Sequence, residues 1–360
     1  MQVSLWEEET FFAPQDFIIA GAGLAGLWTA LELIQKFPTA KILILEKGWI
    51  PTGASTRNAG FACFGSPTEM ISDAAKMGEN AMWEVVEMRY KGIRKIRQNF
   101  KNESIDYEAS GGFECYRKND INQQKVDDCL SCINEGLQNI TGEKNVFKWA
   151  NQKLSTFGFE GFGGMIENKL EGGLHSGKLV QTLLQLVVSK GVQIQYGIPI
   201  ETWEKTGDRL LIFAGKQTYY CTCLILATNA FLPKISGTDL VTPARGQIIA
   251  TEQIPGLSMK GTFHFDEGFY YFRNVGDRIL LGGARNIDFA TEATDELNVT
   301  EPIQQRLTEF IETHLLPGKS FNITHRWSGI MGFTQNKLPH IIEMDSNVFA
   351  MTACNGWAWH

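Results

Sequence analysis

The sequence lacks the features of membrane and nucleic-acid-binding proteins. No apolar run reaches the roughly 18 residues that a membrane-spanning helix needs. The 33 Lys and Arg residues form no basic cluster and are outnumbered by 40 Asp and Glu, which gives a net charge of −7. Residues Met1–Glu9 also lack the basic start and apolar core of a signal peptide. We therefore expect a cytoplasmic protein with no membrane span and no nucleic-acid partner.

Cysteine and histidine are sparse and follow no ligand pattern. The seven cysteines are odd in number and scattered, which fits a reducing compartment better than a disulfide framework. Cys129 and Cys132 form a single C-x-x-C with no second pair, and the first histidine is His175. The histidines show no ligand spacing, so no metal site is predicted.

A glycine-rich turn between two strand-like segments carries the first functional signal. Asp16–Ala20 is typical of a buried strand, a G-x-G-x-x-G turn follows at once, and Lys41–Leu45 predicts a second strand that Glu46 ends. Such glycines allow a tight turn, approach of a pyrophosphate and close helix packing, while the acid binds ribose hydroxyls. The pattern predicts a dinucleotide site formed by Gly21, Gly23, Leu24, Ala25, Gly26 and Glu46.

A second segment of small residues, Gly53–Phe61, follows this unit. Small residues let the backbone approach a flat ring, and Arg57 and Asn58 offer donors to phosphate or ring oxygens. A nicotinamide dehydrogenase does not need such a segment here. An ordinary surface loop is the alternative interpretation.

The rest of the 360-residue chain predicts two interleaved domains. Helical periodicity covers residues 69–100, 123–137, 175–190 and 302–314. Strands are expected at 192–196, 209–213, 219–221 and 224–227, and a second, mostly antiparallel sheet at 243–250, 268–274 and 278–282. Residues 324–333 and 348–352 are expected to be closing strands.

Further motifs follow the two glycine-rich segments: Gly172–Gly177, Leu224–Ala230, Arg245–Gln247, Leu280–Gly283, Trp327–Thr334 with Pro339, and Ala353–Gly356. With these motifs the chain resembles, over essentially its whole length, the FAD-dependent D-amino-acid oxidase superfamily. That group includes glycine oxidase, sarcosine oxidase and γ-glutamylputrescine oxidase. The resemblance implies an α/β (α+β) fold. A Rossmann-like FAD-binding domain (residues 1–85, 160–240 and 325–360) would be interleaved with a mostly antiparallel sheet substrate domain (86–159 and 241–324).

The resemblance also implies how noncovalent FAD is held. The pyrophosphate would lie on Gly21–Gly26, the ribose on Glu46, and the adenine near Lys47 and the backbone at Ile200. The isoalloxazine would lie between the Arg57–Phe61 loop and the C-terminal segments. The other implied cofactor contacts are Ser55, Asn58, Ala59, Gly60, Ala227, Thr228, Asn229, Gly329, Asn355 and Gly356.

The implied reaction is oxidation of the C–N bond of a small amine or amino acid to an imine, with hydride transfer to flavin N5. Oxygen or another electron acceptor would then reoxidise the flavin. Two alternatives keep the fold: an FAD-dependent 2-hydroxy-acid or glycerol-phosphate dehydrogenase, and a truncated FAD-binding protein with little or no activity.

Two positions depart from the family pattern. Met331 stands where glycine oxidase and its relatives have an arginine that pairs with the substrate carboxylate, and where sarcosine oxidase has its flavin-linking cysteine. Leu280 stands where sarcosine oxidase has a lysine that helps flavin react with oxygen, so a quinone or carrier remains open as acceptor. The first departure favours an amine, or a substrate whose carboxylate lies far from the reacting carbon.

Three side chains are candidates to replace the missing arginine. Tyr271 and Arg273 alternate onto one face of a strand, and Arg285 follows the Gly282-Gly283 pair. A buried arginine binds a carboxylate bidentately. A structural ion pair for Arg273 is the alternative. A catalytic role for His264 is less favoured than a packing role.

The chain ends as Asn355-Gly-Trp-Ala-Trp-His360. The family continues this loop into a helix that points at the flavin and stabilises its reduced form. We hypothesise a frameshift, because the codons of the family's Met-Gly-Val-Ala-Leu, read one base late, encode Trp-Ala-Trp-His. A natural short terminus is the alternative. Both predict weaker FAD retention and lower turnover.

Overall fold

The computed structural model describes residues 2–352, 355 and 356, and their contacts group into two compact units. The first unit contains Met1–Thr56, Gly177–Ala244 and Ile330–Ala358. The second contains Arg57–Ser176 and Arg245–Gly329. Each unit has its own sheet and hydrophobic core.

The sheet of the first unit is built around parallel strands. β1 (Gln15–Ala20) pairs in parallel with both β2 (Ile42–Glu46) and β11 (Gln217–Leu226). The strand order is β17 (His340–Asp345), β18 (Val348–Thr352), β11, β1, β2 and β8 (Gln193–Tyr196). β9 (Ile200–Thr206) and β10 (Arg209–Ala214) extend β11 as an antiparallel hairpin. Every residue of β2 is buried, as expected for a parallel strand covered on both faces.

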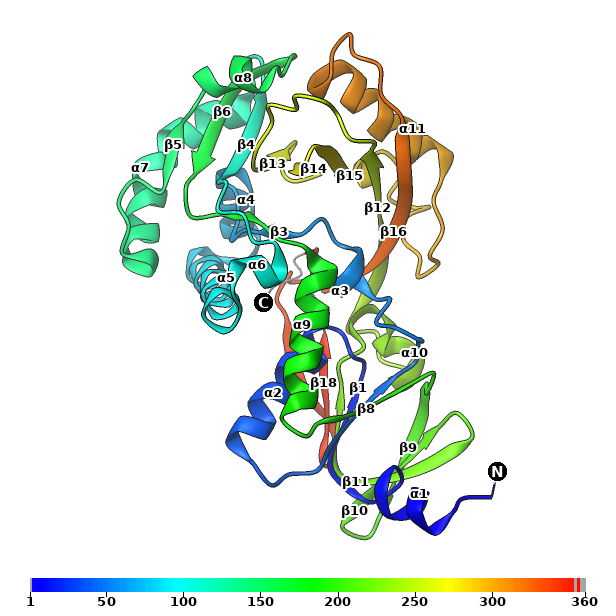
Figure 1. Cartoon of the computed structure of the whole chain (residues 1–360). Helices are drawn as coiled ribbons and strands as arrows, with labels where there is room; N and C mark the ends of the chain where they lie inside the picture. Colours follow the sequence, from blue (N-terminus) through cyan, green and yellow to red (C-terminus); the bar gives the residue numbers. More distant parts are fainter. Residues whose placement is uncertain (1, 353–354, 357–360) are drawn as a thin grey trace. The chain divides into compact units, whose positions relative to one another are not determined.

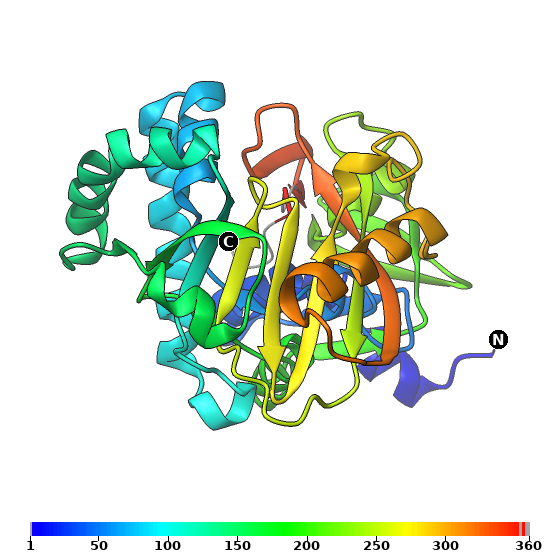
Figure 2. The same ribbon diagram turned by 90° about the horizontal axis from the view of Figure 1, so that it is seen from above.

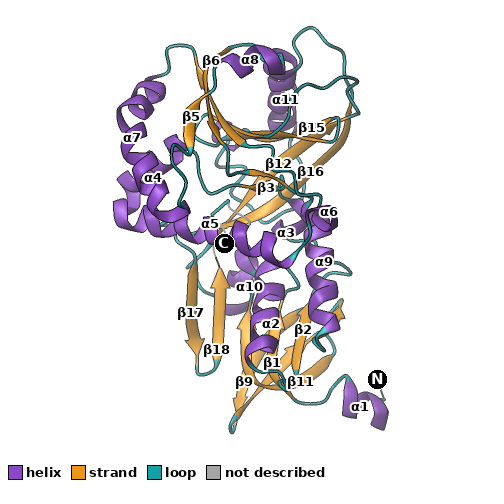
Figure 3. Cartoon of the chain, turned by 60° about the vertical axis from the view of Figure 1, so that its left-hand side comes forward, coloured by secondary structure: helices purple, strands orange, loops and turns teal. Residues whose placement is uncertain are grey.

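Helix α2 (Leu24–Lys36) packs against β1 and β2, as Figures 1 and 3 show. Its buried residues include Leu24, Leu27, Leu31 and Ile34, which recur at three and four positions and face the sheet. Helix α9 (Ser176–Ser189) buries a similar stripe from Leu179 to Val187. The first unit also contains α1 (Leu5–Thr10), α3 (Ala54–Arg57), the 3₁₀ turn η1 (Asn229–Phe231) and α10 (Leu232–Ser236).

The second unit contains a mostly antiparallel sheet, also of eight strands. Its order is β16 (Ile323–Phe333), β12 (Thr242–Thr251), β15 (Arg278–Gly283), β14 (Tyr270–Val275), β13 (Thr262–Phe265), β4 (Gly112–Arg117), β6 (Phe162–Asn168) and β5 (Phe147–Trp149). Neighbours β15–β14 and β14–β13 are antiparallel, whereas β13 and β4 run parallel. In Figure 2 the yellow strands β13 and β14 lie side by side, with the orange helix α11 (Glu301–Phe310) beside the sheet.

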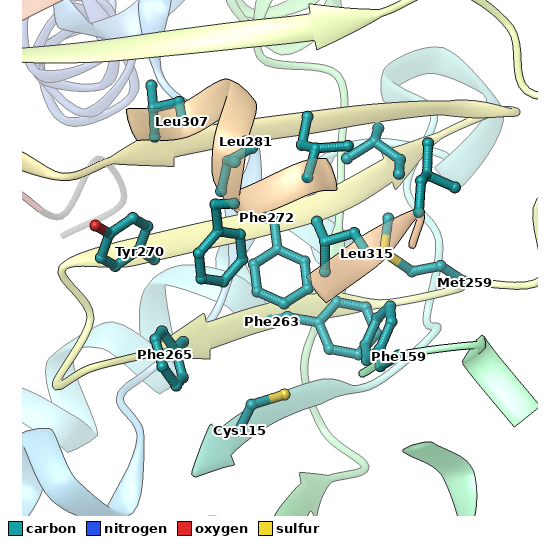
Figure 4. Packing of buried hydrophobic residues seen from close by; sticks show 14 of the residues in the cluster. Cys115, Phe159, Met259, Phe263, Phe265, Tyr270, Phe272, Leu281, Leu307 and Leu315 are labelled. Carbon is teal, nitrogen blue, oxygen red and sulfur yellow. The ribbon is translucent and has the colours of Figure 1, made fainter. Parts of the chain in front are cut away.

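One face of this second sheet is apolar and aromatic (Figure 4). The rings of Phe263 and Phe272 stack with centroids 5.0 Å apart, and Phe113 stacks on Phe263 at 4.8 Å. Leu307 and Phe310 of α11 pack on the same face. Because strand residues alternate, the residues between these phenylalanines point to the opposite face. That opposite face holds the polar residues discussed below.

Helices complete the second unit: α4 (Pro67–Met77), α5 (Glu79–Asn99), α6 (Asn102–Ile105), α7 (Ile121–Thr141), α8 (Gln152–Phe157), the 3₁₀ turn η2 (Arg285–Ile287) and the π-turn η3 (Ile311–Leu315). Two-residue strands β3 (Phe61–Ala62) and β7 (Gly172–Gly173) pair antiparallel. Within the described residues, no helix combines the length and apolar character required to cross a membrane.

The predicted fold class is confirmed. The single helix expected over residues 69–100 is wrong, because Gly78 adopts φ +88° and separates α4 from α5. The two units also differ from the predicted domain division at residues 57–85, 160–176 and 325–329, which group with the second unit, and at 241–244, which group with the first. Residues 57–85 and 160–176 join the second unit because β3 pairs with β7 and α4 packs on α7.

The stacked phenylalanines provide a test of the second core. We expect Phe263→Ala to destabilise the protein by about 3–5 kcal/mol, because it opens a cavity beside two stacked rings. Ile121→Ala, at a position 67% exposed, is the control and should change stability by less than about 0.5 kcal/mol. Urea denaturation followed by tryptophan fluorescence measures both variants. Equal midpoints for the two would contradict this assignment of the core.

Candidate active site

The glycine-rich turn brings the start of α2 close to the end of β1. Gly21 has φ +101°, and a Cβ on Gly26 would overlap its carbonyl oxygen. The packing therefore requires glycine at both positions. Gly23 is the N-cap of α2 and makes no side-chain cap, while the Ser55 hydroxyl accepts a hydrogen bond from Leu24 N–H at 2.9 Å. Ser55 is thus placed beside the first turn of the helix.

Glu46 is oriented by backbone donors on both of its oxygens. Ala22 N–H donates to Oε2 and Gly48 N–H donates to Oε1, both at 2.9 Å. A carboxylate oxygen accepts more than one hydrogen bond, so each oxygen retains capacity for a ribose hydroxyl. The carboxyl ends of β1 and β2 therefore place a fixed acid next to the glycine-rich turn.

The segment after β11, the other neighbour of β1, adds a buried hydroxyl group that could bind a ligand. Ala227 follows β11, and its carbonyl oxygen would lie 3.0 Å from a Cβ on Gly21. The Thr228 hydroxyl is buried and has no hydrogen-bond partner among the described residues. Since buried polar groups are normally satisfied, this hydroxyl fits a bound cofactor. Together with the turn and Glu46, the donor and acceptor set of the first unit fits FAD.

Three other predicted cofactor contacts belong to the first unit. The Lys47 ammonium lies 3.7 Å from the ring centroid of Phe231. Ile200 begins β9 and is buried. Asn229, with φ +46°, accepts a hydrogen bond on its carbonyl oxygen from the Thr352 hydroxyl at 3.2 Å.

Met331 and the last described residues also lie together in the first unit. Asn355 N–H donates to the Gly332 carbonyl oxygen at 2.9 Å, and its side chain accepts from Thr334 N–H at 2.9 Å. A Cβ on Gly356 would lie 3.9 Å from the Met331 sulfur. The hypothesis about Trp357–His360 concerns residues outside those described.

In the second unit, the Arg57–Phe61 loop is fixed against β16. The Arg57 guanidinium donates to the Ser328 carbonyl oxygen at 2.9 Å, and the Trp327 indole donates to the Arg57 carbonyl oxygen at 3.1 Å. A Cβ on Gly329 would lie 3.1 Å from the Arg57 Cβ. The W-S-G motif therefore holds Arg57 in one conformation.

The following part of the loop, through Ala59 and Gly60, is held by Asn58. Its side-chain oxygen accepts from Gly60 N–H at 2.8 Å and from the Ser176 hydroxyl at 2.6 Å. Leu174 N–H donates to the Gly60 carbonyl oxygen at 2.8 Å. The small-residue segment is thus a structured turn joined to the start of α9.

Arg273 is tied to the backbone. Its guanidinium donates to the carbonyl oxygens of Gly60, Leu174 and Asn274 at 2.6–2.9 Å. Burial lowers its pKa to about 10, opposed by the nearby charge of Glu108. The alternative of a structural role thus has contacts in its favour, although the partners are carbonyl groups and form no ion pair. The substrate role of Arg273 stays a prediction.

Tyr271 and Arg285 lie near each other in the second unit. The Tyr271 ring covers Gly282 on β15, and burial raises the pKa of its hydroxyl to about 12 while Arg285 opposes the shift. Arg285 is half-buried, and its guanidinium carbon lies 5.0 Å from the Phe289 ring centroid. Burial lowers the pKa of Arg285, whereas Tyr271 and Glu292 raise it. The Arg285 cation, just after β15, therefore interacts with the Tyr271 phenol, which lies over Gly282 of β15.

Phe61 links Tyr271 to a residue that sequence reasoning gave a packing role, His264. The Phe61 ring meets His264 edge-on at 5.2 Å and Tyr271 at 6.1 Å. Sequence reasoning missed the buried acids around these rings, Glu114 and Glu171. For Glu114, the available sequence signal was the capping box Ser66-Pro-Thr-Glu69, because the Thr68 N–H of this segment donates a hydrogen bond to the Glu114 carboxylate.

The chain belongs to the FAD-dependent oxidoreductase family DAO, whose family description matches residues 16–360. It is therefore an FAD-dependent oxidoreductase, and the predicted superfamily, enzyme class and cofactor are confirmed. Noncovalent attachment and the individual contacts with FAD stay predictions.

Known relatives cover most of this chain. It is 25% identical over 349 residues to the probable oxidoreductase OrdL of Haemophilus influenzae, covering 93% of this chain and 77% of the relative. It is 22% identical to gamma-glutamylputrescine oxidoreductase of Escherichia coli, and this match covers 95% of this chain and 79% of the relative. Glycine oxidase from Geobacillus kaustophilus has a similar structure, with a TM-score of 0.69, 18% identity and coverage of 94% and 89%. Iminodiacetate oxidase from Chelativorans sp. BNC1 also has a similar structure, with a TM-score of 0.74 and 15% identity. The match covers 94% of this chain and 89% of that oxidase.

The glycine-rich turn provides a matched test of cofactor binding. We expect Gly26→Ala to reduce the FAD content of the purified protein at least about tenfold, because the added Cβ pushes α2 away from Gly21. Gly53→Ala is the control, since a Cβ there meets no atom within 4 Å. Released flavin absorbance per protein measures retention, and circular dichroism checks folding. Equal flavin content in a folded Gly26→Ala variant would refute the role of this contact.

Proposed function

We propose that this chain oxidises the C–N bond of a small amine or amino acid to an imine, with hydride transfer to N5 of FAD. The observation that carries the proposal is the similarity, over 95% of the chain, to a relative named gamma-glutamylputrescine oxidoreductase. Glycine oxidase and iminodiacetate oxidase, whose structures are similar, also act by name on compounds with a C–N bond.

The division of labour follows from the residues of each unit. The first unit would hold FAD: the N-terminus of α2 attracts the pyrophosphate, and the doubly oriented Glu46 accepts ribose hydroxyls. Bound FAD supplies the hydride acceptor, and oxygen or another acceptor then takes the electrons. The second unit would supply substrate contacts, and Arg57 and Asn58 would face the flavin from their fixed loop.

Arg285 and Tyr271 are the side chains that we assign to the substrate. Met331 offers no charge to a carboxylate, and the guanidinium of Arg273 already donates to three backbone carbonyl groups. Arg285 keeps a cation beside the Tyr271 phenol. Because Met331 cannot bind a carboxylate next to the reacting carbon, a carboxylate bound by Arg285 would belong to a more remote part of the substrate. The favoured substrates are amines with a remote carboxylate.

Anaerobic reduction of bound flavin tests the reaction. Amines and amino acids should bleach the flavin band, whereas 2-hydroxy acids and glycerol phosphate should leave it unchanged. Reduction by the hydroxy compounds alone would replace the proposal with the dehydrogenase alternative, and no reduction by either panel would favour a protein without activity.

Arg285→Gln tests the carboxylate contact. Loss of a charge-assisted bond should raise KM for a carboxylate-bearing amine roughly tenfold or more and leave the corresponding uncharged amine unaffected. Arg94→Gln, at an exposed position of α5, is the control. A similar change for both substrates would show that Arg285 binds no carboxylate.

A further inference from the structure

The face of the second sheet opposite the aromatic core carries a buried row of ionisable side chains. His264 on β13 pairs directly with Tyr271 on β14 and with Glu114 on β4, so all three point to the same face. Figure 4 shows the opposite face, where Phe263, Phe265 and Phe272 alternate with them. Glu114 is 2% exposed and His264 is 6% exposed. This row is therefore screened from bulk water.

The N-terminus of α4 covers this row and binds the Glu114 carboxyl group. Thr68 N–H and the Tyr116 hydroxyl donate to its Oε2 at 3.2 and 2.5 Å. The Thr68 hydroxyl contacts its Oε1. Ser66, the N-cap of α4, lies 3.0 Å from the same Oε1. The helix N-terminus favours a negative charge here, whereas burial opposes it.

Ser66 connects this carboxyl group to a second one. Its Oγ is 3.0 Å from Glu114 Oε1 and also 3.0 Å from Glu69 Oε2. A hydroxyl has a single proton and donates it to one acceptor at a time. The other contact is a hydrogen bond only if that carboxyl group is protonated and donates to Ser66. The two contacts therefore fit one carboxyl proton that Ser66 shares between Glu69 and Glu114.

Glu69 extends the same chain to His264. The Glu69 Oε2 that contacts Ser66 lies 3.8 Å from His264 Nδ1. An anionic Glu69 therefore stabilises a protonated imidazole, and a protonated Glu69 does not. The charge of His264 and the position of the shared proton are coupled.

The surrounding charges set the working pH of the chain. Burial raises the pKa of Glu114 to about 7 against the donors Thr68 and Tyr116, and raises that of Glu171 to about 8. Burial lowers the pKa of His264, which Glu69 raises and Arg89 lowers. The charged and titratable groups facing the chain are Glu69 and Asp73 of α4, Arg89 of α5, Tyr116 of β4, His264 of β13, Cys63 and Glu171.

We propose that His264, Glu69, Ser66 and Glu114 form a buried proton chain that accepts the proton lost by the substrate amine. This inference rests on the proposed function. An ammonium R₂CH–NH₃⁺ loses one N–H proton, and the bond electrons stay on nitrogen. The C–H hydrogen then leaves with its electron pair as hydride to FAD, which leaves R₂C=NH₂⁺.

The released proton is accepted by the neutral imidazole of His264. As His264 becomes positive, the Glu69 carboxylate 3.8 Å from its Nδ1 stabilises the new charge, and Ser66 connects that carboxylate to the protonated Glu114 carboxyl group. The chain then holds exactly one proton more than before, on the imidazole. Glu69, Ser66 and Glu114 act through His264 and are positioning residues.

Infrared spectroscopy of the purified protein tests the shared proton without an activity assay. At neutral pH the wild type should show protonated carboxyl absorbance from Glu171 and Glu114, Glu114→Gln should remove the Glu114 part of it, and Ser66→Ala should shift the pH at which that part titrates. Glu143→Gln, in an exposed ion pair with Lys169, is the control and should change neither. A wild-type band that persists unchanged in Glu114→Gln would overturn the shared proton.

Stability against pH gives a second readout. Since the pKa of Glu114 is raised in the folded state, the folded protein binds more protons than the unfolded chain between pH 4.5 and about 7. This stabilisation is complete at low pH and is lost as the pH rises through about 7. The thermal midpoint of the wild type should fall over this range. The thermal midpoint of Glu114→Gln, whose side chain mimics the protonated carboxyl group, should fall less. Parallel curves for the two proteins would contradict the proposal.

The pH profile of anaerobic flavin reduction tests the link to chemistry. Glu69→Gln removes the charge that raises the pKa of His264. In Glu69→Gln, the rise of the flavin-reduction rate with pH should move to lower pH by about one unit. The maximal rate should fall roughly tenfold because the imidazole is a weaker base. Glu143→Gln should match the wild type. Normal reduction with an unchanged profile in Glu69→Gln would refute the chain, whereas a wild type that no amine reduces would refute the proposed function.

Discussion

The close approach of helix α2 to the Gly21 turn is the contact on which the cofactor site depends. Gly26 touches the Gly21 carbonyl group so tightly that no Cβ fits between them. This contact fixes the first turn of α2 directly beyond β1, where Ala22 N–H reaches the carboxylate at the end of β2. Helix N-terminus, turn and acid thus share one geometry, and any shift of α2 would move all three.

Local patterns predicted the elements well where one physical effect dominated. The βαβ unit around Gly21–Gly26 follows from spacing alone, because glycine sterics and the ribose acid allow few other arrangements. The break between α4 and α5 was missed, since helical periodicity continues across Gly78 while its φ does not. The Gln123–Leu137 helix was found, but α7 runs from Ile121 to Thr141 because Asp120 caps its start and Gly142 its end.

The substrate side was harder to predict because its contacts join distant segments. Alternation placed Tyr271 and Arg273 on one face, as the structure has them. It could not show that carbonyl groups from Gly60 and Leu174 surround Arg273. Nor could it pair His264 with Glu114, since register between strands nearly 150 residues apart depends on tertiary packing. A single sequence indicates which residues share a strand face, but not which strands are neighbours.

The polar face of the second sheet also explains several glycines in the motifs. Glu171 and Tyr271 cross this face at Gly112 and Gly282, where an added Cβ would overlap them, and Arg273 reaches Gly173 of β7 in the same way. The glycines make room for groups that a sheet face of ordinary residues would exclude. Burying a charged group costs free energy unless it finds a partner, and Glu171 and Arg273 find theirs in the Phe64 N–H and in the Gly60 and Leu174 carbonyl groups. The same contacts that satisfy the buried charges therefore fix the segment that the family places beside the flavin.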